Sequence, residues 1–308
     1  MEKILEDREN RSKLIKSYLE KSNNNIIVIK ANVVGKNKSP YFAYLVVRKF
    51  FGLVKSKLNV LSYHFFESFD GPYFLIETDV DLIKGKEILI KLEDEEKLGR
   101  LVDLDIYGKL QSLSRNDLGY PLRKCLVCDC FAHFCTRSQK HSLVEIENKV
   151  DALIKSYLRD VIKKFIDDAI TFEANLDPKF GLVTINSSGS HPDMDYSLLM
   201  KAKEVIVPDL VEMFFYGFLN DLDDAFKKAR ELGITTEKKM FKATNNINVY
   251  KGLIFILGNV LVALGYAIKN NRSDLSNIIK EIGKDLMKEF DDNIDSFGKK
   301  AYKEFKIS

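Results

Sequence analysis

The chain has 308 residues, of which 45% are hydrophobic and 30% charged, a composition typical of globular proteins and a length that favours two domains. Its 48 lysines and arginines nearly balance its 45 aspartates and glutamates, so the net charge of +3 gives no reason to expect nucleic acid or an anionic membrane as partner. The opening MEKILEDREN is charged and has no apolar signal core. Secretion is therefore not expected, and we expect a cytoplasmic protein.

The first third of the chain predicts an α+β domain. Strands are predicted at residues 25–34, 59–69, 72–80 and 99–108, and helices at residues 39–58 and 81–96. Ser39 is the expected cap of the first of these helices, with Pro40 at its first helical position, and Asp70-Gly71 is a strong hairpin-turn signal. The order strand–helix–strand–strand–helix–strand predicts a split βαβ, or ferredoxin-like, sheet covered by two helices on one face.

The second half predicts helices almost throughout. Helices are expected at residues 144–176, 252–268 and 273–290, with two or three more between 195 and 233. Only the short apolar stretch at residues 181–185 could be a strand. An all-α domain is therefore expected at residues 151–308, with a boundary that lies inside a helix. Residues 252–268 are uncharged, but they are shorter than the ~20 residues of a spanning helix and are interrupted by Asn259. This predicts a buried helix of the α domain.

Two aspartates stand out in the last predicted strand. Because side chains alternate along a strand, Asp103 and Asp105 share one face with Leu101 and Tyr107, while the three residues between them are apolar and suit packing against helices. Two carboxylates on one face can share a Mg²⁺ ion, which relieves their repulsion and holds the oxygens of a triphosphate. The alternative is a solvated strand face that carries two acidic residues.

Arginines surround this strand in the sequence. Arg100 precedes the aspartate pair, and Arg115 and Arg123 follow it. The planar guanidinium group suits bidentate binding of phosphate. An aspartate pair with flanking arginines is the charge balance that a magnesium–triphosphate site needs.

All four cysteines of the chain lie between residues 125 and 135. A C-x2-C-x6-C-x5-H pattern is formed by Cys125, Cys128, Cys135 and His141, which are the ligand types of a tetrahedral structural zinc site. Cys130 and His133 are spare candidates in the same window. The alternatives are reduced cysteines that pack as small hydrophobes, or a redox C-x-x-C pair.

Together these segments resemble the apo-citrate lyase phosphoribosyl-dephospho-CoA transferase family. The segments LGRLVDLDI, LSRNDLGYPLRKCLVC and CTRSQKHSLVEIENKVDALI are similar to that family's G-R-L-x-D-x-D-[VI], L-S-R, R-[RK]-C-L-x-C, C-x-R and H pattern. Arg8 and Arg11 match its opening R-x-x-R helix. The resemblance covers about residues 1–150. One departure is that residues 96–101 read EKLGRL, where the family often has H-P-L-G-R-L.

The resemblance implies a nucleotidyltransferase-like fold and a specific transfer reaction. The prosthetic group would move from 2'-(5''-triphosphoribosyl)-3'-dephospho-CoA to a serine of the citrate lyase acyl carrier protein, with release of pyrophosphate. Mg²⁺ would be held by Asp103 and Asp105. Phosphate groups would be held by Arg100, Arg115 and Arg123, with Arg8 and Arg11 as further candidates. The sequence does not show the general base: Asp105 is a candidate if only one carboxylate is committed to the metal, and His141 if this histidine holds no zinc.

The second half resembles triphosphoribosyl-dephospho-CoA synthase, which makes that precursor from ATP and dephospho-CoA. The similar segments are FEANLDPKFGLV, SGSHPDMD and ATNNINVYKGLIFILG. The sequence departs from the family at Phe180, Asn246, Val249 and Tyr250, and Tyr250 stands where the family has histidine. The chain also ends before two later family segments, so this domain is expected to be shortened and incomplete.

Four residues of the second half remain as candidates for binding a nucleotide. They are His191, Asp193, Asp195 and Lys251. The alternative is that His191 and Asp193 only cap the start of a helix. Synthase activity in this half is left open.

Three functions are therefore compared. The leading one is an enzyme that loads the citrate lyase carrier protein, with a degenerate synthase appended. The second is a bifunctional protein that also makes the precursor. The third is a non-catalytic, zinc-stabilised module that docks the carrier protein.

Overall fold

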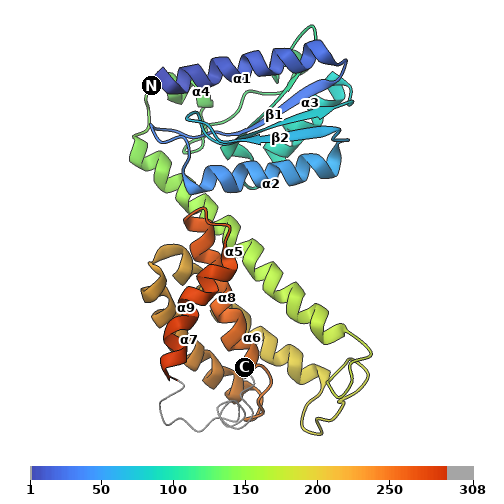
Figure 1. Cartoon of the computed structure of the whole chain (residues 1–308), viewed down its shortest axis with the longest axis vertical. Helices are drawn as coiled ribbons and strands as arrows, with labels where there is room; N and C mark the ends of the chain where they lie inside the picture. Colours follow the sequence, from blue (N-terminus) through green and yellow to red (C-terminus); the bar gives the residue numbers. More distant parts are fainter. Residues whose placement is uncertain (1, 290–308) are drawn as a thin grey trace. The chain divides into compact units, whose positions relative to one another are not determined.

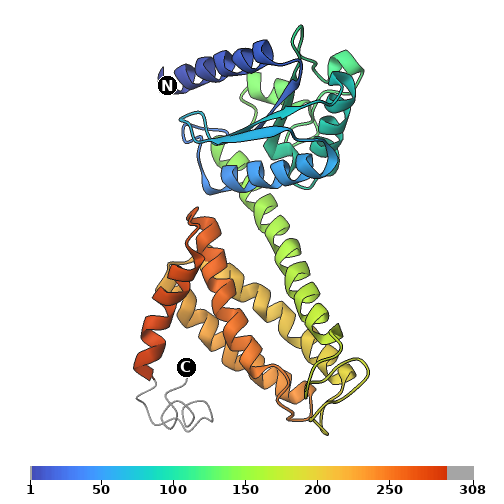
Figure 2. The same ribbon diagram turned by 45° about the vertical axis from the view of Figure 1, so that its right-hand side comes forward.

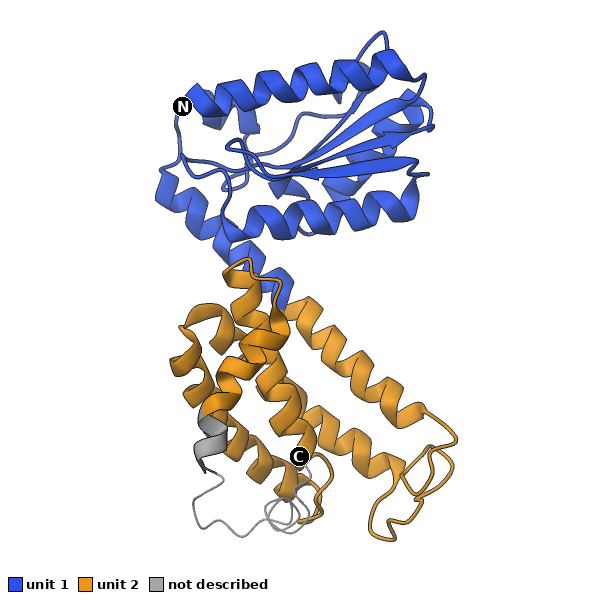
Figure 3. Ribbon diagram, viewed as in Figure 1, with its two compact units in different colours: residues 1–158 blue, residues 159–308 orange. Residues whose placement is uncertain are grey.

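The computed structural model describes residues 2–289 and separates into two compact units, residues 1–158 and 159–308 (Figure 3). The division falls within one continuous helix, α5 (Leu143–Asn175). The predicted all-α domain reaches residue 308, and its residues 290–308 lie outside the described part of the chain.

The first unit is built on a four-stranded antiparallel sheet. Its strands are β1 (Asn25–Ala31), β2 (Ser62–Phe66), β3 (Tyr73–Thr78) and β4 (Val102–Tyr107), in the spatial order β2-β3-β1-β4. Its longer helices are α1 (Glu2–Lys21), α2 (Tyr41–Lys57) and α3 (Leu82–Glu95), followed by the short α4 (Ala132–Arg137). Two single turns, η1 (Gly99–Leu101) and η2 (Asn116–Leu118), complete it. The order of elements and strands confirms the predicted ferredoxin-like sheet.

Helices cover both faces of this sheet (Figures 1 and 2). One face carries fully buried residues such as Ile27, Ile29 and Leu104 and packs against α2 and α3, as predicted. On the other face, Ile15 of α1 forms a buried cluster with Ile26 and residues of β1 and β3. The prediction of two helices on one face therefore omitted α1, whose apolar stripe covers part of the second face.

Two local predictions were wrong. Ser39 does not cap α2, because Pro40 has the extended backbone of the cap position (φ −67°, ψ 159°) and Tyr41 is the first helical residue. Leu101 does not share a strand face with Asp103, because residues 99–101 form the turn η1 and β4 begins at Val102. Leu101 is instead buried in the core.

The second unit is helical in its described residues. After the second part of α5 come α6 (Tyr196–Leu219), α7 (Leu222–Ala243), α8 (Lys251–Lys269) and α9 (Leu275–Glu289). Residues 181–185 form no strand. Helices α6 and α8 approach closely through two glycines: a Cβ on Gly217 would lie 1.9 Å from the carbonyl oxygen of Val262, and one on Gly265 would lie 2.1 Å from that of Phe214. Glycine is required at both positions, because either Cβ would collide with backbone.

Helix α8 is, by length and composition alone, long and apolar enough to cross a membrane, with a mean hydropathy of 1.9. In the structure it packs against α6, α7 and α9, and Ile254, Leu261 and Val262 are buried in that contact. The packing favours the predicted role as a helix of the bundle. The same composition is found in core helices of soluble proteins.

Candidate functional site

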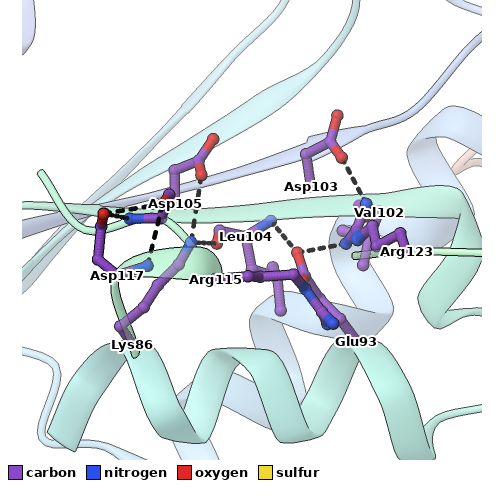
Figure 4. A network of polar contacts seen from close by, with 10 residues as sticks. Lys86, Glu93, Val102, Asp103, Leu104, Asp105, Arg115, Asp117 and Arg123 are labelled. Atoms are coloured by element: carbon purple, nitrogen blue, oxygen red, sulfur yellow. Dashed lines mark hydrogen bonds and ion pairs between the residues drawn. The ribbon is translucent and has the colours of Figure 1, made fainter. Parts of the chain in front are cut away.

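The aspartate pair projects from one face of β4. Val102, Leu104 and Ile106 are fully buried, whereas the side chains of Asp103 and Asp105 are 46% and 53% exposed. Both carboxylates point in the same direction, away from α3 (Figure 4). The predicted alternation along this strand is confirmed, since three apolar side chains anchor the strand and leave both carboxylates free to face a ligand.

Each carboxylate is held by one cation. Lys86 reaches from α3 and donates to the backbone carbonyl of Leu104 (3.0 Å) and to Asp105 (3.3 Å). Arg123 donates to the backbone carbonyl of Val102 and to Asp103, both at 2.8 Å. These contacts are possible because β4 is an edge strand with open backbone groups (Figure 4). The two cations orient the pair and offset its negative charge.

A buried glutamate organises the same edge. Glu93 of α3 accepts the amide hydrogen of Leu104 (2.8 Å), and it pairs with Arg115 (3.2 Å) and with Arg123. Arg115 also pairs with Asp94 (2.6 Å). Its guanidinium is therefore directed to the acidic side chains of α3, whereas that of Arg123 bridges Glu93 and Asp103.

Arg100 lies in η1, directly before β4. Its Nε is buried and has no hydrogen-bond partner among the described residues. Burial, followed by repulsion from Arg123 and Arg115, lowers the pKa of Arg100. Arg100 lines a cavity of about 130 Å³ with Asn32 and the cysteine segment. A buried N–H donor without a partner is costly, so this cavity suits an anionic or carbonyl acceptor.

The two arginines of α1 reach the second face of the sheet. Arg8 and Arg11 both pair with Asp70, at 3.0 Å each. Lys30 of β1 joins the same carboxylate and lies opposite Asp103 in the strand register. The structure thus brings both predicted arginines to the face that carries the aspartate pair.

The cysteine segment gathers four ligand atoms. The Sγ atoms of Cys125, Cys128 and Cys135 and a ring nitrogen of His141 all lie within 4.8 Å of one another. The His141 Nε2 is 3.2 Å from the Cys128 sulfur. Burial, and then the neighbouring thiols, raise the pKa of Cys135 to about 12. The group predicted from spacing could hold a metal ion.

The spare candidates lie outside this group. The Cys130 sulfur lies 3.2 Å from the Lys140 Nζ, and the His133 ring stacks on Phe131. A ring nitrogen of His141 lies among the three thiols, so His141 stays a candidate base only if this group holds no metal ion.

The second unit has a cavity of its own, of about 250 Å³. Its lining includes Glu173, Lys179, His191, Asn248 and Tyr250, which come from the three segments similar to the synthase family. The Tyr250 side chain is 8% exposed, and its hydroxyl has no hydrogen-bond partner among the described residues. The cavity therefore presents one unused polar group next to the Glu173–Lys179 pair, which is 3.0 Å apart.

One alternative considered for this unit is wrong, and three of the candidate residues lie outside the cavity lining. The helix cap is Asp195, which accepts the amide hydrogen of Leu198 at 2.7 Å, so His191 and Asp193 do not cap α6. Lys251 is not among the lining residues and pairs with Glu237 at 3.3 Å. Asp193 and Asp195 do not line the cavity either.

Four residues of the first unit were missed by the sequence reasoning. They are Lys30, Asp70, Lys86 and Glu93. A lysine that ends an apolar strand was the only signal for Lys30, and Asp70 was read as a turn residue. Lys86 and Glu93 face β4 from one helix, which a charge at a core-facing position could have suggested.

Comparison with known proteins finds a matching family model for each unit. Residues 1–157 match the family of apo-citrate lyase phosphoribosyl-dephospho-CoA transferase, and residues 159–306 match that of ATP:dephospho-CoA triphosphoribosyl transferase. Protein CitXG of Leuconostoc mesenteroides subsp. cremoris is 30% identical over 308 aligned residues, which cover 92% of this chain and 66% of the relative. Protein CitXG of Haemophilus influenzae is 34% identical, over 63% of this chain and 42% of the relative.

A third relative matches part of the chain. It is a 2-(5''-triphosphoribosyl)-3'-dephosphocoenzyme-A synthase of Haemophilus ducreyi, 34% identical over 45% of this chain and 44% of its own length. The chain thus spans less than two thirds of the length of each of these relatives. Residues 159–306 match the family model of ATP:dephospho-CoA triphosphoribosyl transferase. Over residues 1–157 the chain belongs to the apo-citrate lyase phosphoribosyl-dephospho-CoA transferase family.

Proposed function

We propose that the first unit transfers the phosphoribosyl-dephospho-CoA group from 2'-(5''-triphosphoribosyl)-3'-dephospho-CoA to a serine of the citrate lyase acyl carrier protein, in the cytoplasm. The family match supports this reaction. The observation that carries it is the common direction of the Asp103 and Asp105 carboxylates on β4, each held by its own cation. Such a pair suits a reaction in which negative charge builds on a departing diphosphate.

The reaction is a substitution at phosphorus. The serine oxygen attacks the phosphorus that carries the ribose 5'' oxygen, the bond from this phosphorus to the next bridging oxygen breaks, and pyrophosphate leaves with the electron pair. The proton of the serine hydroxyl passes to a base. Asp105, the more exposed carboxylate of the pair, is our candidate for the case in which Asp103 alone is committed to the metal.

The donor set of the site fits magnesium. Asp103 and Asp105 offer exposed carboxylate oxygens on one face, which are the ligands that Mg²⁺ prefers. Bound there, Mg²⁺ would neutralise charge on the phosphate oxygens. Arg123 and Lys86 keep the two carboxylates in place. Arg100, which precedes β4 and lines a neighbouring cavity, is our further candidate for a phosphate contact.

We assign a structural zinc ion to the four ligands of the cysteine segment. Zinc–sulfur bonds of about 2.3 Å in a tetrahedron place ligand atoms about 3.8 Å apart. The observed separations of 3.2 Å and 3.5 Å for two of the pairs, and below 4.8 Å for all, suit that geometry.

Mass spectrometry of the carrier protein tests the transfer. The carrier is incubated with the full chain, Mg²⁺ and the triphosphoribosyl precursor, and its mass is expected to rise by the phosphoribosyl-dephospho-CoA group. Asp103→Asn and Asp105→Asn should each slow modification by roughly 100-fold or more, as loss of a transition-state contact does. Asp79→Asn, an exposed aspartate that bonds Asn59, is the matched control.

The outcomes separate the candidates. Full modification by the Asp103→Asn, Asp105→Asn double variant would remove the proposed mechanism. Carrier protein that binds without release of pyrophosphate would instead support the non-catalytic docking module.

A second function is favoured by the cavity of the second unit. Segments far apart in the sequence converge there on Glu173, His191 and Tyr250, which suits binding of ATP or dephospho-CoA. Chromatography of the full chain with both compounds tests whether this unit also makes the precursor. Release of adenine would support the bifunctional protein, and its absence would leave transfer as the activity of the chain.

A further inference from the structure

A buried aspartate anchors three cations on the second face of the sheet. The side chain of Asp70 is 0% exposed, and one of its oxygens accepts from Arg8, whose Nε lies at 3.1 Å. The other oxygen accepts from Arg11 at 3.1 Å and pairs with Lys30. The turn that carries Asp70 is itself tied to α1, because Asp7 accepts the amide hydrogen of Asp70 (3.3 Å).

The cluster has more N–H donors than its own pairing uses. Within the cluster one carboxylate, that of Asp70, faces three cations. Two further carboxylates lie nearby, Asp7, which accepts from the turn that carries Asp70, and Asp103, opposite Lys30. Each arginine has five N–H donors and the lysine has three, and only part of this set is used on Asp70. Burial, partly offset by Asp70, lowers the pKa of Lys30, and Arg11 and Arg8 lower it further. The arrangement is costly by itself and would be relieved by an anion.

The cluster and the aspartate pair share a face. Lys30 lies directly opposite Asp103 in the antiparallel register of β1 and β4, and cross-strand partners point to the same side of a sheet. The Arg8 side chain is 50% exposed, while those of Arg11 and Lys30 are 15% and 18% exposed. One cation thus reaches solvent while two are fixed near the sheet.

We propose that Arg8, Arg11 and Lys30, anchored by Asp70, form a binding site for a diphosphate group next to Asp103. The inference rests on the proposed transfer reaction and deepens it. The N–H donors of Arg8, Arg11 and Lys30 that Asp70 does not use, gathered next to Asp103, suit the oxygens of a diphosphate. We assign this diphosphate to the departing pyrophosphate, because Lys30 lies next to the carboxylate pair at which we expect the substrate phosphates to bind. Asp70 is a positioning residue that keeps three mutually repelling cations together.

Binding of inorganic pyrophosphate to the full chain, with Mg²⁺, tests the site by calorimetry. Lys30→Met and Arg8→Gln should each weaken binding roughly tenfold, since each removes one charge-assisted contact. Arg8→Gln serves as the second variant because its exposed side chain makes loss of folding a smaller concern. The matched control is Lys84→Met, an exposed lysine on α3, which should bind as the wild type does.

A second arm identifies the source of the diphosphate. Dephospho-CoA contains a diphosphate of its own, so its binding is measured with the same variants. Loss of pyrophosphate affinity alone supports the leaving-group assignment, and a loss for dephospho-CoA alone would overturn it. Wild-type affinity for pyrophosphate in both variants, with a lowered melting temperature, would show that the cluster is only structural. A wild-type chain that binds no pyrophosphate would also overturn the site.

The inference and the proposed function fail separately. If the chain binds pyrophosphate through this cluster but never modifies the carrier protein, the transfer reaction is wrong and the site stands. If the chain modifies the carrier while both variants keep their pyrophosphate affinity, the site is wrong and the reaction stands.

Discussion

Glu93 is the residue on which the edge of β4 depends. Its carboxylate is 5% exposed and serves the amide of Leu104, Arg115 and Arg123 at once. Glu93→Ala removes one partner of buried ion pairs and is expected to destabilise the unit by about 3 kcal/mol. Hydrogen exchange across residues 102–107 measures this as faster exchange. Glu95→Ala, an exposed residue of the same helix, is the control, and equal protection in both variants would contradict the role of Glu93.

Asp70 makes the first unit sensitive to acid. Burial alone would raise its pKa, but hydrogen bonds from Arg8, Lys30 and Arg11 outweigh burial and lower it. A lowered pKa in the folded state means that Asp70 stabilises the fold above its unfolded value of about 3.9, and that this contribution is lost as pH falls through the folded pKa.

Asp70→Asn has no such charge to lose. Its melting temperature should therefore fall less steeply than that of the wild type as pH decreases below about 4. Calorimetry over a pH series measures the two slopes, with Asp79→Asn expected to keep the wild-type slope. Parallel curves for Asp70→Asn and wild type would show that the buried pairing adds no acid dependence.

Residue positions within one element were predictable, and contacts between elements were not. The direction of Asp103 and Asp105 follows from the two-residue period of a strand, which is local. The role of Asp70 depends on α1 lying over β1, and the role of Glu93 depends on β4 being an edge strand. Neither tertiary contact can be predicted from the neighbouring residues. The sequence therefore indicated only a turn at Asp70 and a helix at Glu93.

At the scale of elements, the segment from Cys125 to His141 brings four potential metal ligands together. We expect one zinc ion per chain, measured by elemental analysis of the purified protein. Cys135→Ser should lose the ion, because a structural zinc site needs all four ligands. Cys130→Ser is the matched control, since this thiol faces Lys140 outside the group, and it should keep the ion. Equal metal content in the two variants would contradict the assigned ligand set.

The order of elements was predictable because each has a strong local signal. The β-branched residues of β1 predict a strand, and the helical spacing of apolar residues in α3 predicts a helix. The order of all six elements is then typical of one common arrangement, the ferredoxin-like sheet. The ends of elements were less predictable. Leu101 and Ser39 were misplaced by about one residue, since η1 and the extended Pro40 result from tertiary contacts at the strand and helix ends.

At the scale of the whole molecule, the change near the middle of the sequence from strand-like to helical hydrophobic patterns predicted an α+β domain followed by an all-α domain. Strands occupy residues 25–107, and the described residues from 143 onward are helical apart from their connecting loops. Each unit has a cavity or cluster of its own, with Arg100 in the first and Tyr250 in the second. The burial of the unpartnered Tyr250 hydroxyl could not be predicted from the sequence. It depends on how the segment before α8 packs near Glu173 of α5 and Leu199 of α6.

Because each unit carries its own residues, we expect the two activities to separate in the full chain. Tyr250→Phe removes a buried hydroxyl that has no partner, so it should leave the fold as stable as before or raise stability by up to about 1 kcal/mol. It should weaken binding of ATP or dephospho-CoA, measured by calorimetry, and leave carrier modification from supplied precursor within about twofold of wild type. Asp103→Asn should show the reverse pattern. If Tyr250→Phe instead slows carrier modification as strongly as Asp103→Asn does, the two units share one site, and the assignment of transfer to the first unit alone is wrong.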